Sequence, residues 1–248
     1  MLQVGTGKRL PLCAGTLIDK NSVASNINCH NSIIGIAQNS KDQVHAYFYI
    51  NSMSYILTTG RSVGIPQGVA NENFDYKTQH GDFVVFKLAY SLDIPPALLS
   101  DHPPKPNTNF FVVGSGATTN LDSEKHPRVA MDWDIGILSV LDTSKCASSY
   151  SKNPYQDLHP LYDGKHLICA LSDSISPCYR ENGMPLLDVI KVNSQDRVVI
   201  FGFLSFKANN CTIGSASTFG IPYDYQSFFK ETAPESAFVN VCQETGKC

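Results

Sequence analysis

The chemically richest stretch of the sequence is residues 176–187, which read Ser-Pro-Cys-Tyr-Arg-Glu-Asn-Gly-Met-Pro-Leu-Leu. At its centre, Asn182-Gly183 is a strong signal for a hairpin turn, because both residues tolerate positive φ. The carboxamide of Asn182 has no hydroxyl or thiol that a base could activate, so acyl transfer has no starting point at this residue. Taken alone, the stretch predicts a turn.

The eight cysteines are the second set of residues with chemical potential. An even number indicates disulfides formed in an oxidising compartment. Zinc is the competing interpretation, but the sequence has no Cys-x-x-Cys or His-x-x-x-His pair. Disulfides are therefore favoured, and we expect no metal and no cofactor. The sequon Asn210-Cys211-Thr212 is compatible with secretion and with glycosylation at Asn210.

Charge and hydropathy exclude several classes of partner. The 248 residues carry 19 basic and 22 acidic side chains, a net charge of −3, with no basic stripe typical of nucleic-acid binding. Apolar runs such as residues 198–201 are too short to span a bilayer. The chain opens without a charged and then apolar leader, so we expect Met1 to begin a mature or trimmed form.

The elements predicted by the sequence are mostly strands. Short runs rich in Val, Ile, Phe and Tyr alternate with Gly, Asn, Asp, Ser or Pro, a texture typical of an all-β sandwich or barrel; examples are residues 44–50, 83–88, 110–113 and 198–204. Helical periodicity is scarce. One helix is predicted near residues 224–230, where Tyr225, Phe228 and Phe229 share a face. Five prolines in residues 93–109 predict a connector.

Four segments resemble the chymotrypsin/trypsin family, and they occur in the family's order. Residues 13–18, Cys-Ala-Gly-Thr-Leu-Ile, resemble its Cys-Gly-Gly-Thr-Leu-Ile, and residues 22–29, Ser-Val-Ala-Ser-Asn-Ile-Asn-Cys, its Trp-Val-Leu-Thr-Ala-Ala-His-Cys. Residues 81–88, Gly-Asp-Phe-Val-Val-Phe-Lys-Leu, are similar to Asp-Ile-Ala-Leu-Leu-Lys-Leu. Residues 176–187 resemble the segment around the nucleophile, Cys-x-Gly-Asp-Ser-Gly-Gly-Pro-Leu.

The resemblance implies an all-β fold of two packed antiparallel β-barrels, followed by a short C-terminal helix and a cysteine-bearing tail. It places the N-terminal barrel in residues 1–92, the proline-rich linker in 93–109, the second barrel in 110–222 and the helix and tail in 223–248. It also implies the disulfides Cys13–Cys29 and Cys146–Cys169, and Cys178–Cys211 beside the nucleophile segment. The remaining cysteines, Cys242 and Cys248, lie in a tail beyond the usual end of the family, where a small terminal loop is the simplest closure and pairing with another partner stays open.

The same resemblance predicts a degenerate catalytic triad. Asn182 stands where the family has its nucleophilic serine, and Asn28 where it has the general-base histidine; asparagine does not titrate near neutrality and cannot relay a proton. Asp82 matches the acid that orients the base. We prefer a structural role for Asp82, as a buried carboxylate that holds neighbouring backbone in place. His30, two residues beyond Asn28, is the alternative base, and its other interpretation is a surface histidine.

Other family positions also depart from the pattern. Arg180 replaces the glycine of the oxyanion hole, where a β-carbon disfavours the backbone geometry that aims an N–H at the oxyanion. Glu181 replaces the aspartate that receives the new N-terminus on activation, and Met184 replaces a glycine that allows close packing.

The specificity pocket is altered in the same way. The resemblance assigns Ser176 to the pocket floor, where trypsin-like enzymes carry aspartate, and Phe206 to its wall. Lys207 takes the place of a glycine that opens the pocket, so that its stem either fills the entrance or is a solvated loop lysine. Ser217 lies near a second pocket glycine.

The resemblance therefore predicts a secreted, extracellular, non-catalytic protease homologue that works as a protein-binding module, as a decoy, inhibitor or cofactor. Partners expected from such relatives are a protease, a glycoside hydrolase or an immune component. Neither nucleic acid nor a membrane span is expected. The alternative is a divergent active hydrolase with a displaced nucleophile and base, using His30 and a serine outside the matched segments.

Overall fold

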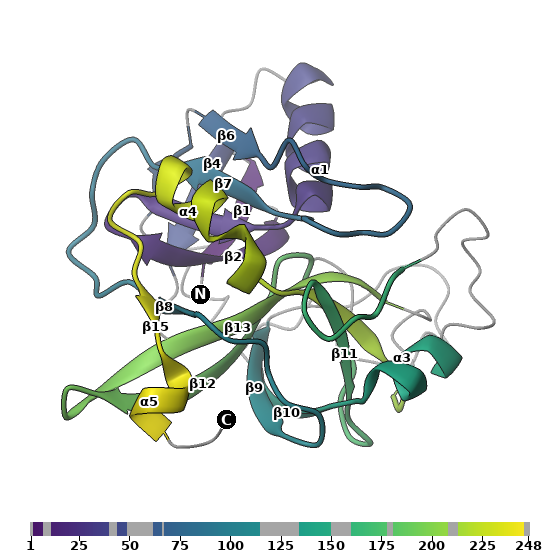
Figure 1. The fold of residues 1–248 in the computed structure, drawn as a ribbon. Helices are drawn as coiled ribbons and strands as arrows, with labels where there is room; N and C mark the ends of the chain where they lie inside the picture. The colour runs from purple at the N-terminus through teal and green to yellow at the C-terminus, as the bar shows by residue number, and fades with distance from the viewer. Residues whose placement is uncertain are drawn as a thin grey trace.

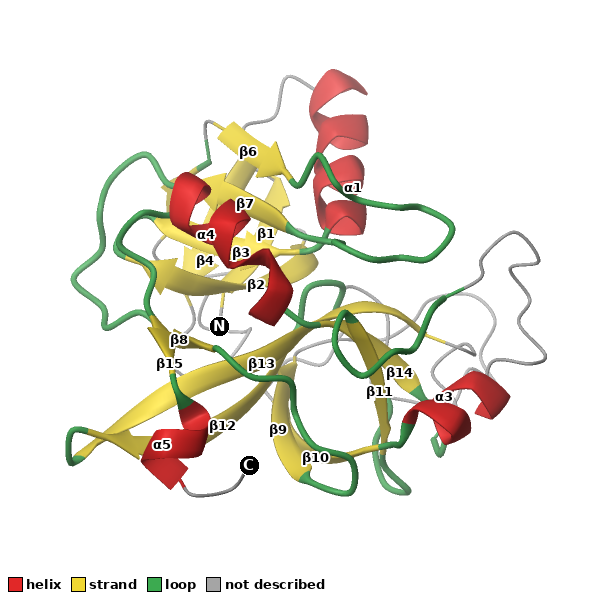
Figure 2. Ribbon diagram, viewed as in Figure 1, coloured by secondary structure: helices red, strands yellow, loops and turns green. Residues whose placement is uncertain are grey.

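A computed structural model gives the structure of the chain and describes residues 2–6, 11–39, 44–48, 62–65, 67–114, 134–149, 160–177, 181–207 and 213–245. Two β-sheets lie against each other (Figure 1). The strands between residues 2 and 87, purple to blue, form the upper layer, and the strands between residues 98 and 239 form the lower one. The helices lie around the sheets (Figure 2).

The first sheet has seven strands that pair antiparallel throughout. Successive side chains of a strand point to opposite faces of the sheet, and in the central strands the side chains on both faces are buried. Val84 and Phe86 pack into the core of this sheet, whereas Phe83 and Val85 face the second sheet. In spatial order the strands are β5 (Ser62–Gly64), β4 (Val44–Phe48), β1 (Leu2–Thr6), β2 (Pro11–Asp19), β3 (Ser22–Ser25), β7 (Val84–Lys87) and β6 (Gln67–Ala70).

The second sheet closes on itself, because β12 pairs with both β9 and β13. Strands around this barrel are β12 (Pro185–Val192), β9 (Asn109–Gly114), β10 (Asp134–Val140), β11 (Leu167–Leu171), β14 (Ser217–Gly220) and β13 (Gln195–Lys207). Along β9 exposure alternates, with Phe110 and Val112 buried inside the barrel. The all-β fold class predicted from the sequence is thereby confirmed.

Two short strands extend the second sheet beyond the barrel. β8 (Leu98–Ser100) pairs in parallel with β13, and β15 (Phe238–Val239) pairs in parallel with β8. The predicted connector, residues 93–109, thus contributes a fully buried strand to the second sheet. α5 (Val241–Thr245) follows β15 and packs against β12.

Aromatic rings from both sheets meet under the C-terminal helix. A 3-10 turn, η1 (Tyr223–Tyr225), leads into α4 (Gln226–Thr232), which confirms the helix predicted near residues 224–230. The Phe83 ring lies with its centroid 5.0 Å from that of Tyr225, 5.3 Å from Phe229 and 6.2 Å from Phe203. This packing fixes the chain beside Asp82.

Three further helices among the described residues were not predicted, namely α5 and the two that follow. α1 (Ile27–Asn39) is rich in Asn and Ile, which are weak helix formers, so no helical pattern stands out in its sequence. It is capped by Asn26, whose Oδ1 accepts from the Cys29 N–H at 2.9 Å. α3 (Thr143–Ser149) is capped in the same way by Asp142, which accepts from the Lys145 N–H at 2.8 Å.

Two predicted disulfides are confirmed, Cys13–Cys29 and Cys146–Cys169. The first ties α1 to β2 and the second ties α3 to β11. Cys242 is also disulfide-bonded. Its predicted partner Cys248, and both members of the predicted pair Cys178–Cys211, lie outside the described residues.

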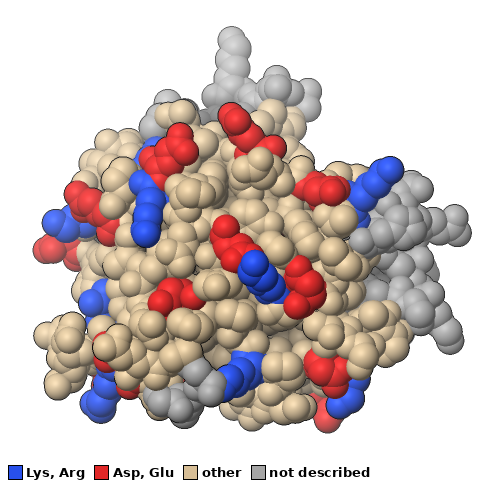
Figure 3. All heavy atoms as spheres, viewed as in Figure 1, with Lys and Arg blue, Asp and Glu red and all other residues tan. Residues whose placement is uncertain are grey.

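On the face shown in Figure 3, basic and acidic side chains are interspersed, in keeping with the small net charge. No helix in the described ranges has the length and apolar character needed to cross a bilayer.

Candidate functional site

Asp82 lies just before β7 and is almost completely buried, with 1% of its surface exposed. Its Oδ1 accepts from the Ile27 N–H at 2.8 Å, and its Oδ2 accepts from the Ser205 hydroxyl. Desolvation raises the pKa of Asp82 to about 6, although both hydrogen bonds act in the opposite direction. The carboxyl group therefore connects the start of α1 to β13.

Asn28 is the second residue of α1 and is exposed. Asp82 contacts the backbone N–H of Ile27, the residue before it, and not a titratable side chain. The Asn28 carbonyl accepts from the Ser32 hydroxyl at 2.8 Å, as expected within a helix. The position predicted for the general base thus lies at the solvent-facing start of the helix.

Asn26, which the sequence analysis did not single out, is the buried asparagine of this region, with 0% exposure. Its Nδ2 donates to the carbonyls of Leu204 and Ser205 at 2.9 and 3.2 Å, while its Oδ1 caps α1. The side chain therefore joins the first sheet to β13. An Asn immediately before a helix is the sequence signal that identifies such a cap.

We expect Asn26→Ala to lower the free energy of unfolding by about 2 kcal/mol, because it removes a helix cap and the buried hydrogen bonds that the amide donates to the carbonyls of Leu204 and Ser205. Asn28→Ala, in the same helix but exposed, is the matched control and should change stability by less than about 0.5 kcal/mol. Urea denaturation measures both. Equal effects of the two substitutions would contradict the role assigned to Asn26.

Asn182 and Gly183 form the predicted turn, with Gly183 at φ +79°. The Asn182 carbonyl accepts from the Ala14 N–H at 2.8 Å, and the Gly183 N–H donates to the Leu204 carbonyl at 2.8 Å. The Ala14 carbonyl in turn accepts from the Ser25 hydroxyl at 2.7 Å. The turn is thereby held against β2 and β13, next to the segments that carry Asn26 and Asp82.

Glu181 and Met184 flank this turn and are both buried. The Glu181 carboxylate lies directly against Gly114, where an added β-carbon would overlap its Oε1. Met184 packs into the core of the second barrel. Arg180, predicted at the former oxyanion hole, lies outside the described residues.

Comparison of the chain with known protein families and solved structures shows which family has this arrangement of segments. The family model described as Trypsin matches residues 1–229. The chain belongs to the trypsin family. Among solved structures it is similar to neuropsin, a serine protease expressed in the limbic system of mouse brain, with a TM-score of 0.70 and 14% identity over 93% of this chain and 92% of that one. No curated protein matches the chain in sequence.

Three of the predicted pocket residues of this trypsin-family chain lie on neighbouring strands. In the β13–β14 ladder Phe206 pairs with Thr218, and Lys207 pairs with Ser217. Phe206 packs beside the Cys146–Cys169 disulfide. Ser217 is buried, and its hydroxyl has no hydrogen-bond partner among the described residues.

Two further residues were predicted at the specificity pocket, Ser176 and Lys207. Ser176 is half-buried, and its hydroxyl donates to the carbonyl of the adjacent Pro177 at 3.4 Å. The Lys207 side chain lies outside what the structure describes.

His30, the alternative base of this trypsin-family chain, is half-buried on α1. Its ring lies 6.1 Å from the Phe86 ring, and a β-carbon on Gly68 would stand 2.9 Å from its Cδ2. Burial lowers the pKa of His30. Its ring makes no hydrogen bond to any described residue, and the hydrogen bonds of Asp82 go to Ile27 and Ser205.

Proposed function

We propose that this chain is a secreted, catalytically inactive member of the trypsin family that acts by binding another protein. The observation that carries the proposal is the environment of Asp82. Its two oxygens accept hydrogen bonds from the Ile27 backbone and the Ser205 hydroxyl, while Asn28 and Asn182 stand at the positions that resemble the family's base and nucleophile.

Chemistry supports this proposal. Acyl transfer needs a nucleophile that a base can activate, and neither asparagine supplies one. Loss of the nucleophile or base of a triad lowers kcat on the order of 10⁶-fold. The catalysis that remains in such mutants depends on the oxyanion hole and on substrate binding. In this chain Arg180 stands at the position that resembles the glycine of the oxyanion hole.

The fold nevertheless retains what a binding surface requires. Hydrogen bonds among Ala14, Asn26, Asn182, Gly183 and Leu204 hold the segments around the former cleft together. Disulfides Cys13–Cys29 and Cys146–Cys169 anchor α1 and α3. Loops on such a rigid scaffold bind partners without a large cost in ordering entropy. The partner we propose is a protease, a glycoside hydrolase or an immune component.

Labelling with a fluorophosphonate probe tests the inactivity. We expect no labelled band at concentrations where trypsin is labelled to completion, because no activated serine is present. Labelling that disappears in His30→Ala would instead establish the divergent hydrolase.

Binding is tested by affinity capture from the fluid into which the protein is secreted, followed by measurement of the captured enzyme's activity. For a glycoside hydrolase partner we expect saturable inhibition that survives Asn182→Ala, since binding does not need a nucleophile. If the protein slows no hydrolase and captures no protease or immune component, the binding role is wrong even where the inactivity holds.

A further inference from the structure

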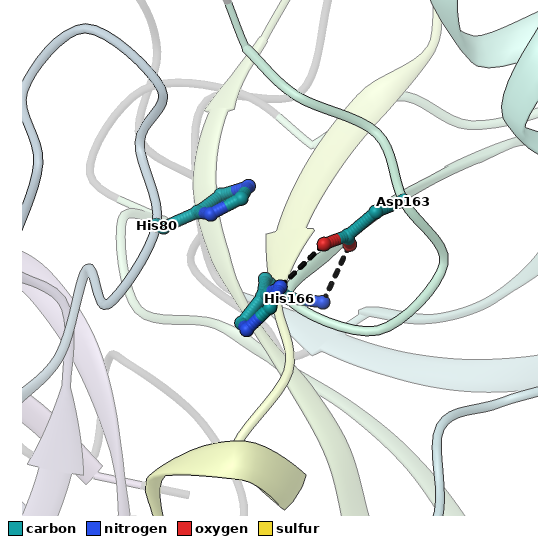
Figure 4. Close-up of side chains that lie close together, drawn as sticks. All are labelled: His80, Asp163 and His166. Carbon is teal, nitrogen blue, oxygen red and sulfur yellow. Dashed lines mark hydrogen bonds and ion pairs between the residues drawn. The ribbon is translucent and has the colours of Figure 1, made fainter.

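A cluster of two histidines and an aspartate lies where the first sheet meets the second barrel. His80 comes from the turn that precedes Asp82, and Asp163 and His166 come from the turn that precedes β11. The His80 and His166 rings are stacked with centroids 4.6 Å apart, and the Asp163 carboxylate lies beside them (Figure 4). The two turns are joined by the His80 Nε2, which contacts the Leu161 carbonyl at 2.9 Å.

Asp163 is held in place by its own turn. Its Oδ1 accepts from the N–H groups of Lys165 and His166 at 3.0 and 2.7 Å, and Gly164, between Asp163 and Lys165, adopts φ +71°. Its Oδ2 faces the His166 Nδ1. One carboxylate oxygen therefore maintains the turn, while the other is oriented toward the His166 ring.

The ring of His80 is positioned by an acceptor at one nitrogen, and that of His166 by acceptors at both, because its Nδ1 faces the Asp163 Oδ2. The His80 Nε2 contacts a carbonyl, which can only accept, so the proton lies on Nε2 and the lone pair on Nδ1. The His166 Nε2 lies 3.1 Å from the Asp224 Oδ2, which also binds the Lys165 ammonium at 2.8 Å. A carboxylate on the outer nitrogen of a histidine is the usual second partner of a metal-bound imidazole.

We propose that His80, Asp163 and His166 form a site for a divalent transition-metal ion such as Zn²⁺, with Asp224 as the outer partner of His166. The sequence analysis expected no metal, because no pair of ligands has a recognisable spacing. One candidate ligand atom from each of the three residues lies within 4.8 Å of the others. A tetrahedral zinc ion with bonds of about 2.1 Å places its ligands about 3.4 Å apart, so small inward rotations of the side chains complete the site.

The ligand set also selects the class of ion. Two imidazoles and one carboxylate suit Zn²⁺, whereas Ca²⁺ and Mg²⁺ prefer oxygen ligands throughout. The side chains of Asp163 and His166 remain 28% and 27% exposed, which leaves a path for the ion and a position for water. A bound ion would link the first sheet to the second barrel, two residues from Asp82. Because it binds the folded chain, it would also stabilise it.

Isothermal titration of the full chain with ZnCl₂ tests the site, with CaCl₂ and MgCl₂ titrated in parallel. We expect saturable binding of zinc but not of calcium or magnesium, a thermal unfolding midpoint that rises with zinc concentration, and reversal of both by a chelator. His80→Ala and His166→Gln should each weaken zinc binding more than about tenfold, and Asp224→Asn by about tenfold.

The matched control is His102→Ala. His102 also lies beside a carboxylate, with its Nδ1 2.5 Å from the Asp101 Oδ1, but it is not part of the three-residue cluster. This variant should bind zinc as tightly as the unaltered chain. All variants are first compared by thermal unfolding in chelator, so that a folding defect is separated from a lost ligand. Absence of saturable zinc binding, or binding unchanged in His80→Ala, would overturn the proposal without bearing on catalytic inactivity.

Discussion

Gly183→Ala is expected to destabilise the protein by about 2–5 kcal/mol. Positive φ at a residue with a β-carbon costs about 1–2 kcal/mol, and forcing an atom into a packed interior adds about 1–3 kcal/mol. At φ +79° a β-carbon on Gly183 would overlap the Ser25 hydroxyl and stand 2.5 Å from the Ala14 carbonyl. Those groups are bonded to each other, so neither can withdraw without breaking that hydrogen bond.

Chemical denaturation of Gly183→Ala and Gly214→Ala measures this effect. Gly214 has nearly the same dihedral, φ +78°, but a β-carbon there would meet nothing within 4 Å. Its substitution should therefore cost only the conformational part, about 1–2 kcal/mol. If both variants lose the same stability, the close packing of the Asn182-Gly183 turn against β2 and β3 is not what holds the former nucleophile segment in place.

Between about pH 4 and pH 6 the free energy of unfolding is expected to fall by about 3 kcal/mol, because the pKa of Asp82 is raised in the folded chain. The substitution Asp82→Asn should remove most of this pH dependence. Below pH 3.8 the acid is protonated in both the folded and the unfolded chain. As pH rises toward 6, the unfolded chain releases its proton, but the buried carboxyl keeps it, because its pKa is raised to about 6. The folded state therefore loses stability between about pH 4 and pH 6 and stays at the lower level above that range. Asparagine does not titrate.

The measurement is the free energy of unfolding of both proteins at several pH values between 4 and 8. The difference, Asp82→Asn minus the unaltered chain, should rise by about 3 kcal/mol across that range. Ser205→Ala should make the total fall of stability larger and extend it to higher pH, since it removes a hydrogen bond that lowers the pKa of Asp82. Parallel pH profiles for the unaltered chain and Asp82→Asn would show that the carboxyl group is not buried as described.

Much of the fold could be predicted because cysteines and a few short motifs fix the register of the chain. Cys13 and Cys29 bracket the segment that ends β2 and begins α1, and their disulfide is present. Gly183 was expected in a turn and has the positive φ that such a turn requires. Short runs rich in Val, Ile, Phe and Tyr correctly located β4, β7, β9 and β13, because β-branched and aromatic residues bounded by turn residues are typical of strands.

The features that were missed depend on contacts between distant parts of the chain. α1 has weak intrinsic helix propensity and is stabilised by its disulfide and by the cap from Asn26. The importance of Asn26 depends on carbonyls 178 and 179 positions away. His80 and His166 lie 86 residues apart in the sequence (166 − 80) and share no motif. Only the packing of the first sheet on the second barrel brings them together.

Turnover of a fluorogenic peptide library tests the central claim most directly. At micromolar protein, with trypsin as the positive control, we predict no cleavage above background, because loss of a triad nucleophile or base lowers kcat on the order of 10⁶-fold. Sustained peptide hydrolysis that co-purifies with the chain and is abolished by His30→Ala or Ser205→Ala would contradict the account and establish a working catalytic site.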